Sequence, residues 1–176
     1  MTLHHFIGAN IELPTGSFGR NPTYKPLSEL KLKGMGEDKH NKKNNGSKLV
    51  KAYETEEDAS GIDVLNLVSG YELVRDKFPT PFVSEVQGYL DTNITSFHRK
   101  SIKSLFSYIE EHLLKGDFIE IYSCWDGQEE KEKDNSKDVV INLTTLQFGN
   151  HIRLNDINHL CETFFLDDQQ YVLVKK

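Results

Sequence analysis

The chain has 176 residues, of which 37% are hydrophobic, 27% charged and 10% aromatic. This length suits one globular domain that buries a core without disulfides or structural metals. The net charge of −6 argues against a general nucleic-acid-binding protein, because phosphate contacts need clustered lysine and arginine side chains.

The sequence has no features of a membrane or secreted protein. No apolar run approaches the roughly 20 residues that a membrane-spanning helix needs. The N-terminal residues 1–8 lack the basic start and long apolar stretch of a signal peptide. Cys124 and Cys161 lie among apolar residues, and we expect both to be free and buried. We therefore expect a cytoplasmic protein that does not bind membranes.

The first half of the chain predicts strands separated by loops. Leu3 to Leu13 and Ile62 to Val68 have the length and composition of strands. Residues 34–48 consist mostly of glycine, lysine and asparagine, and we expect a mobile surface loop there. Tyr71 to Arg75 fits either a strand or a helix. In Phe82 to Tyr89 the residues of two opposite faces alternate along the segment, which predicts a strand with one face exposed.

The strongest pattern lies between residues 95 and 125. Apolar residues recur at helical spacing and form the stripe of an amphipathic helix: Ile102, Leu105, Phe106, Ile109 and Leu113. Thr95 or Ser96 is suited to cap this helix, and Gly116 follows as a stop. Phe118 to Trp125 is apolar on both faces, which indicates a central strand.

The C-terminal part predicts two more strands and a helix. Val139 to Leu143 follows a charged loop, and we expect it to form a β-hairpin with the central strand. Asn155 to Phe165 predicts a short helix, and Gln170 to Lys175 predicts the last strand.

These elements together favour the α+β class, because strands dominate and the helices do not alternate with them regularly. We expect a mainly antiparallel sheet of about five to seven strands, packed against a principal amphipathic helix and one shorter C-terminal helix. Residues 1–176 are expected to form a single domain with the mobile loop at 34–48.

The seven histidines do not predict a metal site. His4 and His5 are adjacent on a strand and point to opposite faces. His98 and His112 share one helix, about 21 Å apart. No Cys-x-x-Cys or His-Glu-x-x-His motif occurs. We expect neither a metal nor a cofactor.

The sequence assigns no catalytic residue. No nucleophile signature accompanies Cys124 or Cys161, and Gly-x-Ser-x-Gly is absent from the sequence. Glu120 is the most interesting acid, because it interrupts an apolar strand and buried carboxylates concentrate at active sites. Pairing with a nearby lysine or arginine would make it structural instead. The chain fits a non-enzyme better, with a small hydrolase-like enzyme that uses Glu120 as the alternative.

A docking surface for a protein partner is predicted where the central strand ends. The single tryptophan lies there with a tyrosine, before a strongly charged loop, and both residue types are enriched in interfaces. The predicted contact residues are Tyr122, Trp125, Asp126, Glu129 and Glu130. The alternative role for Trp125 is to close the end of the core.

In size, acidity, expected fold class and lack of catalytic motifs, the chain resembles bacterial immunity proteins, which neutralise toxins. The resemblance covers composition and length and no specific motif. It implies a protein-binding module that docks a basic partner through an acidic face, where electrostatic attraction speeds capture. The alternatives are the Glu120 enzyme and a self-assembling structural subunit, such as a homodimer joined through open sheet edges.

Overall fold

The computed structural model describes residues 2–26, 49–68, 70–150 and 152–176. The chain divides into two compact units, 20–59 and a larger one made of 1–19 and 60–176, and each is described by itself. The mobile loop predicted at 34–48 lies outside the described residues.

The smaller unit is a β-hairpin followed by one helical turn. β3 (Thr23–Pro26) pairs antiparallel with β4 (Leu49–Ala52), and α1 (Glu56–Ala59) follows. Lys25 Nζ lies 2.5 Å from Glu54 Oε1. None of the described residues of this unit is buried, so the core and the candidate site belong to the larger unit.

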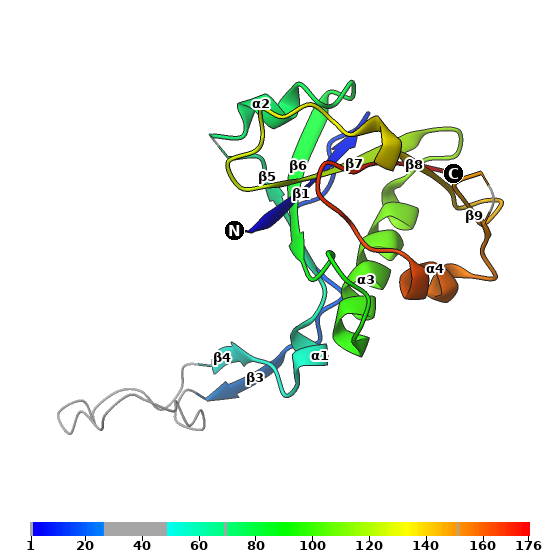
Figure 1. The fold of residues 1–176 in the computed structure, drawn as a ribbon. Coiled ribbons are helices and arrows are strands. Elements are labelled where there is room, and N and C mark those ends of the chain that lie inside the picture. The colour runs from blue at the N-terminus through cyan, green and yellow to red at the C-terminus, as the bar shows by residue number, and fades with distance from the viewer. Residues whose placement is uncertain (1, 27–48, 69, 151) are drawn as a thin grey trace. The chain divides into compact units, whose positions relative to one another are not determined.

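The larger unit contains one nine-stranded sheet in the order β10-β9-β8-β11-β7-β1-β6-β5-β2 (Figure 1). Its strands are β1 (Leu3–Ala9), β2 (Gly16–Phe18), β5 (Ile62–Asn66), β6 (Phe82–Gly88), β7 (Phe118–Trp125), β8 (Val139–Asn142), β9 (Gln147–Phe148), β10 (Ile152–Arg153) and β11 (Tyr171–Lys175). Neighbouring strands are antiparallel except β8 and β11. The predicted α+β class with a mainly antiparallel sheet is confirmed.

The predicted number of strands, five to seven, is wrong. The described part of the sheet includes β2, β9 and β10, which are two or three residues long. Such short strands fall below the span over which alternation of apolar and polar residues can be recognised.

The predicted hairpin between the central strand and residues 139–143 is also wrong. β7 pairs with β1 on one edge and with β11 on the other, while β8 pairs parallel to β11. The charged segment 126–138 therefore crosses over the position of β11 to reach β8. The last strand of the chain fills the place that the sequence pattern suggested for β8.

Two helices cover one face of the sheet. The predicted apolar stripe of α3 (Ser96–His112) is buried, and the Thr95 side chain caps its N-terminus by accepting from the His98 N–H. The helix ends at His112, one turn before Gly116. α4 (Ile157–Thr163) packs beside it, with the rings of Phe106 and Phe164 5.2 Å apart between centroids.

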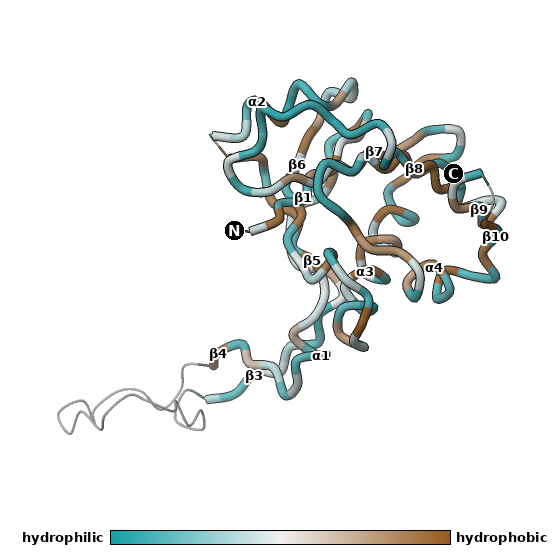
Figure 2. Tube along the Cα trace, in the orientation of Figure 1, coloured by the Kyte–Doolittle hydropathy of each residue, from teal (hydrophilic) through white to brown (hydrophobic). Residues whose placement is uncertain are grey.

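A second, smaller layer covers the opposite face of the sheet. It is formed by α2 (Glu72–Arg75) and the segments around it, against a buried cluster of Phe6, Val74, Phe78, Tyr122 and Cys124. The segment 126–138 runs beside α2 (Figure 1), since Lys77 Nζ donates to the Lys131 carbonyl. Figure 2 shows that this segment is mostly hydrophilic. β7 is therefore buried on both faces, as its composition predicts.

None of the helices in the described parts of the chain has the length and hydrophobicity that a membrane span requires.

Replacement of Leu105 by alanine tests the packing of α3. Leu105 is 1% exposed, and we expect Leu105→Ala to lower the free energy of unfolding by about 2–5 kcal/mol. The control is Leu114→Ala, because Leu114 follows the same helix and is 59% exposed; its cost should stay under about 0.5 kcal/mol. Equal costs in denaturant titrations would contradict the assigned helix face.

Candidate functional site

The candidate site lies at the end of the sheet where β1 begins. Here β1 runs antiparallel to the last residues of β7, so that Leu3 lies opposite Trp125. Just beyond β7, the Asp126 N–H donates to the Thr2 carbonyl. The chain thus brings the predicted docking residues Trp125 and Asp126 to the start of β1.

β1 and β6 separate at this same end of the sheet. Their pairing stops at His5 and Val86. Beyond that point β1 continues beside β7, while Gln87 and Gly88 of β6 continue beside β5. A cavity of about 290 Å³ occupies the gap, and we call it the split pocket; its lining residues are Thr2, Leu3, His4, His5, Glu85, Val86, Gln87 and Gly88.

Polar side chains gather on the wall of the split pocket. Glu85 is 5% exposed, and its Oε1 lies 3.4 Å from His4 Nδ1 and accepts from Gln87 Nε2 at 3.0 Å. The Tyr71 hydroxyl lies 3.3 Å from the same His4 nitrogen. Among the described residues, the ion-pair partner of Glu85 is therefore a histidine, which is charged only when protonated. The pocket wall presents a buried carboxylate that no permanent positive charge neutralises within the described structure.

The predicted docking residues at and after the end of β7 lie together. Trp125 is the last residue of β7, and turns follow it up to residue 130; we call residues 125–130 the acidic rim. Trp125 and Glu129 are half-buried, whereas Asp126 and Glu130 are exposed. Four of the five predicted docking residues therefore lie together.

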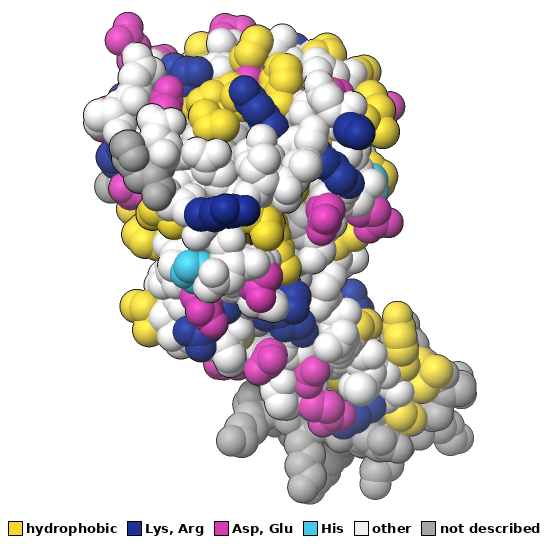
Figure 3. Space-filling view, turned by 90° about the vertical axis from the view of Figure 1, so that its right-hand side faces the viewer, with side chains coloured by type: hydrophobic (Ala, Val, Ile, Leu, Met, Phe, Trp, Pro, Cys, Tyr) yellow, Lys and Arg dark blue, Asp and Glu magenta, His cyan; other side chains and the backbone are white. Residues whose placement is uncertain are grey.

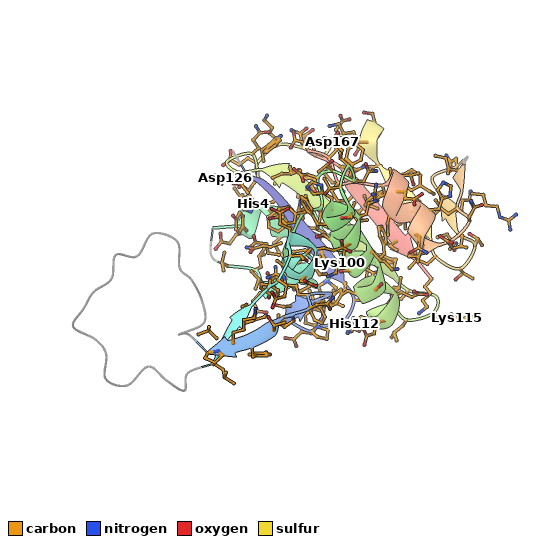
Figure 4. The ribbon with its side chains drawn as sticks, turned by 90° about the horizontal axis from the view of Figure 1, so that it is seen from below. His4, Lys100, His112, Lys115, Asp126 and Asp167 are labelled. Carbon is orange, nitrogen blue, oxygen red and sulfur yellow. The ribbon has the colours of Figure 1, made fainter. Side chains whose placement is uncertain are left out.

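The acidic rim places negative charge over the start of β1. Burial raises the pKa of Tyr71, and the charges of Glu85, Asp126 and Glu129 raise it further. Figure 4 shows Asp126 and His4 at the same end of the sheet. The carboxylate of the split pocket and those of the rim thus both raise the pKa of Tyr71, beside the start of β1.

Tyr122, the fifth predicted docking residue, lies beneath the surface. Its side chain is fully buried in the second layer, and burial raises its pKa to about 12. Its hydroxyl has no hydrogen-bond partner among the described residues. Tyr122 therefore belongs to the core of the second layer in this conformation, and its direct contact with a partner stays a prediction from sequence.

His5 occupies the opposite face of β1 from His4, as strand geometry requires. Its Nδ1 lies 2.8 Å from Ser123 Oγ, and both side chains are buried. Burial, with a smaller contribution from the charge of His4, lowers the pKa of His5 from 6.5 to about 3. His5 is therefore neutral in the folded protein near pH 7.

Glu120 is buried in the second layer, where it is 1% exposed. Thr80 Oγ1 donates to its Oε2 at 2.7 Å, and the Tyr171 hydroxyl donates to its Oε1. Burial and this bond to the carboxylate raise the pKa of Tyr171. Two hydroxyl groups, rather than a lysine or arginine, therefore satisfy the carboxylate.

Gly8 makes this arrangement around Glu120 possible. It lies opposite Glu120 in the sheet, and a Cβ there would lie 2.4 Å from Phe78 Cδ1 and 2.5 Å from Thr80 Oγ1. Only glycine lets Thr80 approach the sheet closely enough to reach the carboxylate. Glu120 therefore anchors the segment that covers it, and it lines neither the split pocket nor the cavity along residues 144–155.

Signals for other kinds of site are weak in the described residues. They contain no group of three or more histidine, cysteine or acidic residues that could hold a metal ion. Cys124 and Cys161 are free and buried, as predicted. The cavity along residues 144–155 has a volume of about 870 Å³, and Arg153 is the charged residue among its described lining residues.

Sequence reasoning did not find the split pocket. It noted that His4 and His5 face opposite ways but assigned neither a role. The partner of His4, Glu85, is 81 positions away in the chain, so no local spacing connects the two. The one available signal was a pair of histidines at the start of an apolar strand.

Comparisons with known proteins gave no relative. No family model matches the chain, and neither the search of curated proteins nor that of solved structures found a match.

Two variants test the hydrogen bonding of tyrosine hydroxyls in the second layer. Tyr122→Phe removes a buried hydroxyl that has no partner in the described structure, so we expect the free energy of unfolding to stay unchanged or to rise by about 1–3 kcal/mol. Tyr171→Phe removes the hydroxyl that donates to Glu120 and should lower the free energy of unfolding by about 1–3 kcal/mol. Denaturant titrations in which Tyr122→Phe is the more damaging change would contradict this assignment.

The buried His5 predicts a loss of stability in acid. The unfolded chain binds a proton at this position below about pH 6.5, whereas the folded chain does so only near pH 3. Stability is thus fully present above pH 6.5 and falls between these values, by about 1.4 kcal/mol per pH unit. His5→Gln should remove that part of the slope, as measured by denaturant titrations from pH 7 to pH 4. Identical slopes in the two proteins would contradict the assignment.

Proposed function

We propose that this protein is a binding module that docks a basic protein partner at the acidic rim. The observation that carries the proposal is the concentration of negative charge at the start of β1. The acidic rim, residues 125–130, contains three acidic and no basic side chains, a net charge of −3, and the charges of Asp126, Glu129 and the buried Glu85 all raise the pKa of Tyr71.

Negative charge near the rim also acts on Cys124, the residue before Trp125. The pKa of Cys124 is raised to about 12 by burial and then by the charges of Glu129 and Asp168, against a smaller opposing effect of Lys77. Negative potential at a surface attracts positively charged partners and accelerates their association. Lys131 moderates this potential, but its ammonium donates to Gln128 Oε1 within the turns.

Trp125 gives the rim an aromatic anchor. It is half-buried, it is the last residue of β7, and its backbone N–H donates to Asp168 Oδ1. A tryptophan held by the backbone beside charged residues has the character of an interface hot spot. We infer that Trp125 contacts the partner and that the rim carboxylates surround that contact.

Other surfaces of the larger unit differ from the rim. On the side that carries β9 and α4, Figure 3 shows basic and acidic side chains interspersed. Such mixed charge gives no preference for a basic partner. The Glu120 enzyme and the self-assembling subunit remain alternatives, and the hydroxyl bonds that satisfy Glu120 support a structural role for that residue.

The proposal is tested by the rate of association with a protein that the chain captures from extracts of its native host. We expect Glu129→Gln with Glu130→Gln to slow association and to weaken its dependence on salt, with dissociation nearly unchanged. The matched control is Glu110→Gln with Glu111→Gln, which removes two adjacent exposed carboxylates from α3.

Stopped-flow measurements should show the slower association only for the rim variant. Equal effects of the two pairs would show that net charge, rather than the rim, determines capture. Recovery of no stoichiometric partner from the native host would also count against docking.

A further inference from the structure

The split pocket joins the acidic rim directly. Thr2 accepts from the Asp126 N–H, and Leu3 lies opposite Trp125, and both Thr2 and Leu3 line the pocket. A partner seated on the rim therefore has the pocket within reach of one of its side chains.

The size of the split pocket suits a side chain better than a whole ligand. Its volume of about 290 Å³ lies at the lower limit of small-molecule sites, which span roughly 300–1,000 Å³. The pocket lies between two strands of the sheet, and we infer that it admits an extended, narrow group. A long side chain with a polar end has this shape.

The charge of the pocket wall selects a cation. A buried carboxylate is costly unless a positive group or several donors satisfy it. Glu85 has a histidine nitrogen at 3.4 Å and an amide donor at 3.0 Å, contacts that are longer than those of a strong charge-assisted pair. A cation in the pocket would add a charge-assisted hydrogen bond to the Glu85 carboxylate, to which the Gln87 side chain already donates.

An aromatic ring on the pocket wall favours a planar cation. His4 lines the pocket, and its ring packs against that of Tyr71 with 5.3 Å between the centroids. A guanidinium group stacks on such a ring and binds a carboxylate through two parallel hydrogen bonds, whereas an ammonium group is a strongly hydrated point charge. Arginine therefore matches the pocket better than lysine.

We propose that the split pocket binds one arginine side chain of the partner, with its guanidinium group against the Glu85 carboxylate. This inference rests on the proposed function, because it assumes a protein partner at the acidic rim. It adds a specificity element, since the rim attracts any basic surface and the pocket selects an arginine on it.

The test uses a small probe instead of the partner. The ¹⁵N-labelled full chain is titrated with N-acetyl-L-arginine methylamide, and the amide signals of Leu3, His4, Gln87 and Gly88 are followed by NMR. We expect saturable shifts at these four amides. The neutral isostere N-acetyl-L-citrulline methylamide should bind at least about tenfold more weakly, because a charge-assisted hydrogen bond is replaced by a neutral one. N-acetyl-L-lysine methylamide should also bind more weakly.

Variants locate the binding group. Glu85→Gln should abolish the saturable shifts, while Glu111→Gln, an exposed carboxylate on α3, should leave them unchanged. If Glu85→Gln does not fold, the three probes on the unaltered chain decide the question. Equal binding of the arginine and citrulline probes, equal binding of the lysine probe, or no saturable shift at all would each overturn the proposal.

The rim variant separates this inference from the proposed function. Glu129→Gln with Glu130→Gln should leave saturable probe binding at the pocket amides. Probe shifts that follow the rim carboxylates instead of Glu85 would overturn the arginine pocket. If the pocket fails while the rim pair still slows association with the partner, docking stands without the arginine.

Discussion

The burial of β7 on both faces is the constraint on which the rest of the structure depends. A strand that is apolar on both sides needs a layer over each face and a neighbour along each edge. α3 and α4 supply one layer, and α2 with its flanking segments supplies the other. β1 and β11 supply the neighbours along its two edges, and the last strand of the chain thus lies between β7 and β8.

The two layers differ in how they treat polar groups. Beneath α3 the buried polar pair is His5 with Ser123, a neutral hydrogen bond. The thinner second layer covers two carboxylates, Glu120 and Glu85. In the same layer, the hydroxyl groups of Thr80 and Tyr171 donate hydrogen bonds to the Glu120 carboxylate. Glu85 lies one residue before the point where β1 and β6 separate, and it lines the split pocket there.

The different surroundings of the two carboxylates indicate different roles. Glu120 is enclosed by the chain's own donors and stabilises the fold. Glu85 lies on a cavity wall beside a histidine and a tyrosine, next to a turn rich in acidic side chains. A cavity-lining carboxylate whose ion-pair partner in the described structure is a histidine, close to the negatively charged rim, is the group best suited to bind a cation from another molecule.

Local sequence patterns predicted what depends on local contacts. The stripe of α3, its cap at Thr95 and the doubly buried β7 all follow from residues a few positions apart, and the structure contains each of them. The same reasoning placed Trp125 at the end of the sheet beside a charged turn, where it lies. It also identified Glu120 as unusual, although its donors, Thr80 and Tyr171, were not evident.

Long-range pairing was beyond the reach of these patterns. The parallel pairing of β8 with β11 and the contact of His4 with Glu85 join positions far apart in the chain. Tyr122 was predicted to belong to the docking surface because it lies three positions before Trp125. Successive residues of a strand face opposite sides, so residues three apart do as well; Tyr122 is buried, and its contact with a partner stays a prediction. With no relative to compare, sequence alone could not show where β1 and β6 separate.

We propose that a basic partner binds at the start of β1, over the acidic rim and the split pocket. Amide hydrogen exchange of the full chain, with and without the partner captured from its native host, locates the binding surface. We expect binding to slow exchange in residues 2–5, 87–88 and 125–130, with no change along the exposed side of α3. Protection confined to β8–β10 or to α3, with unchanged exchange at the start of β1, would contradict it.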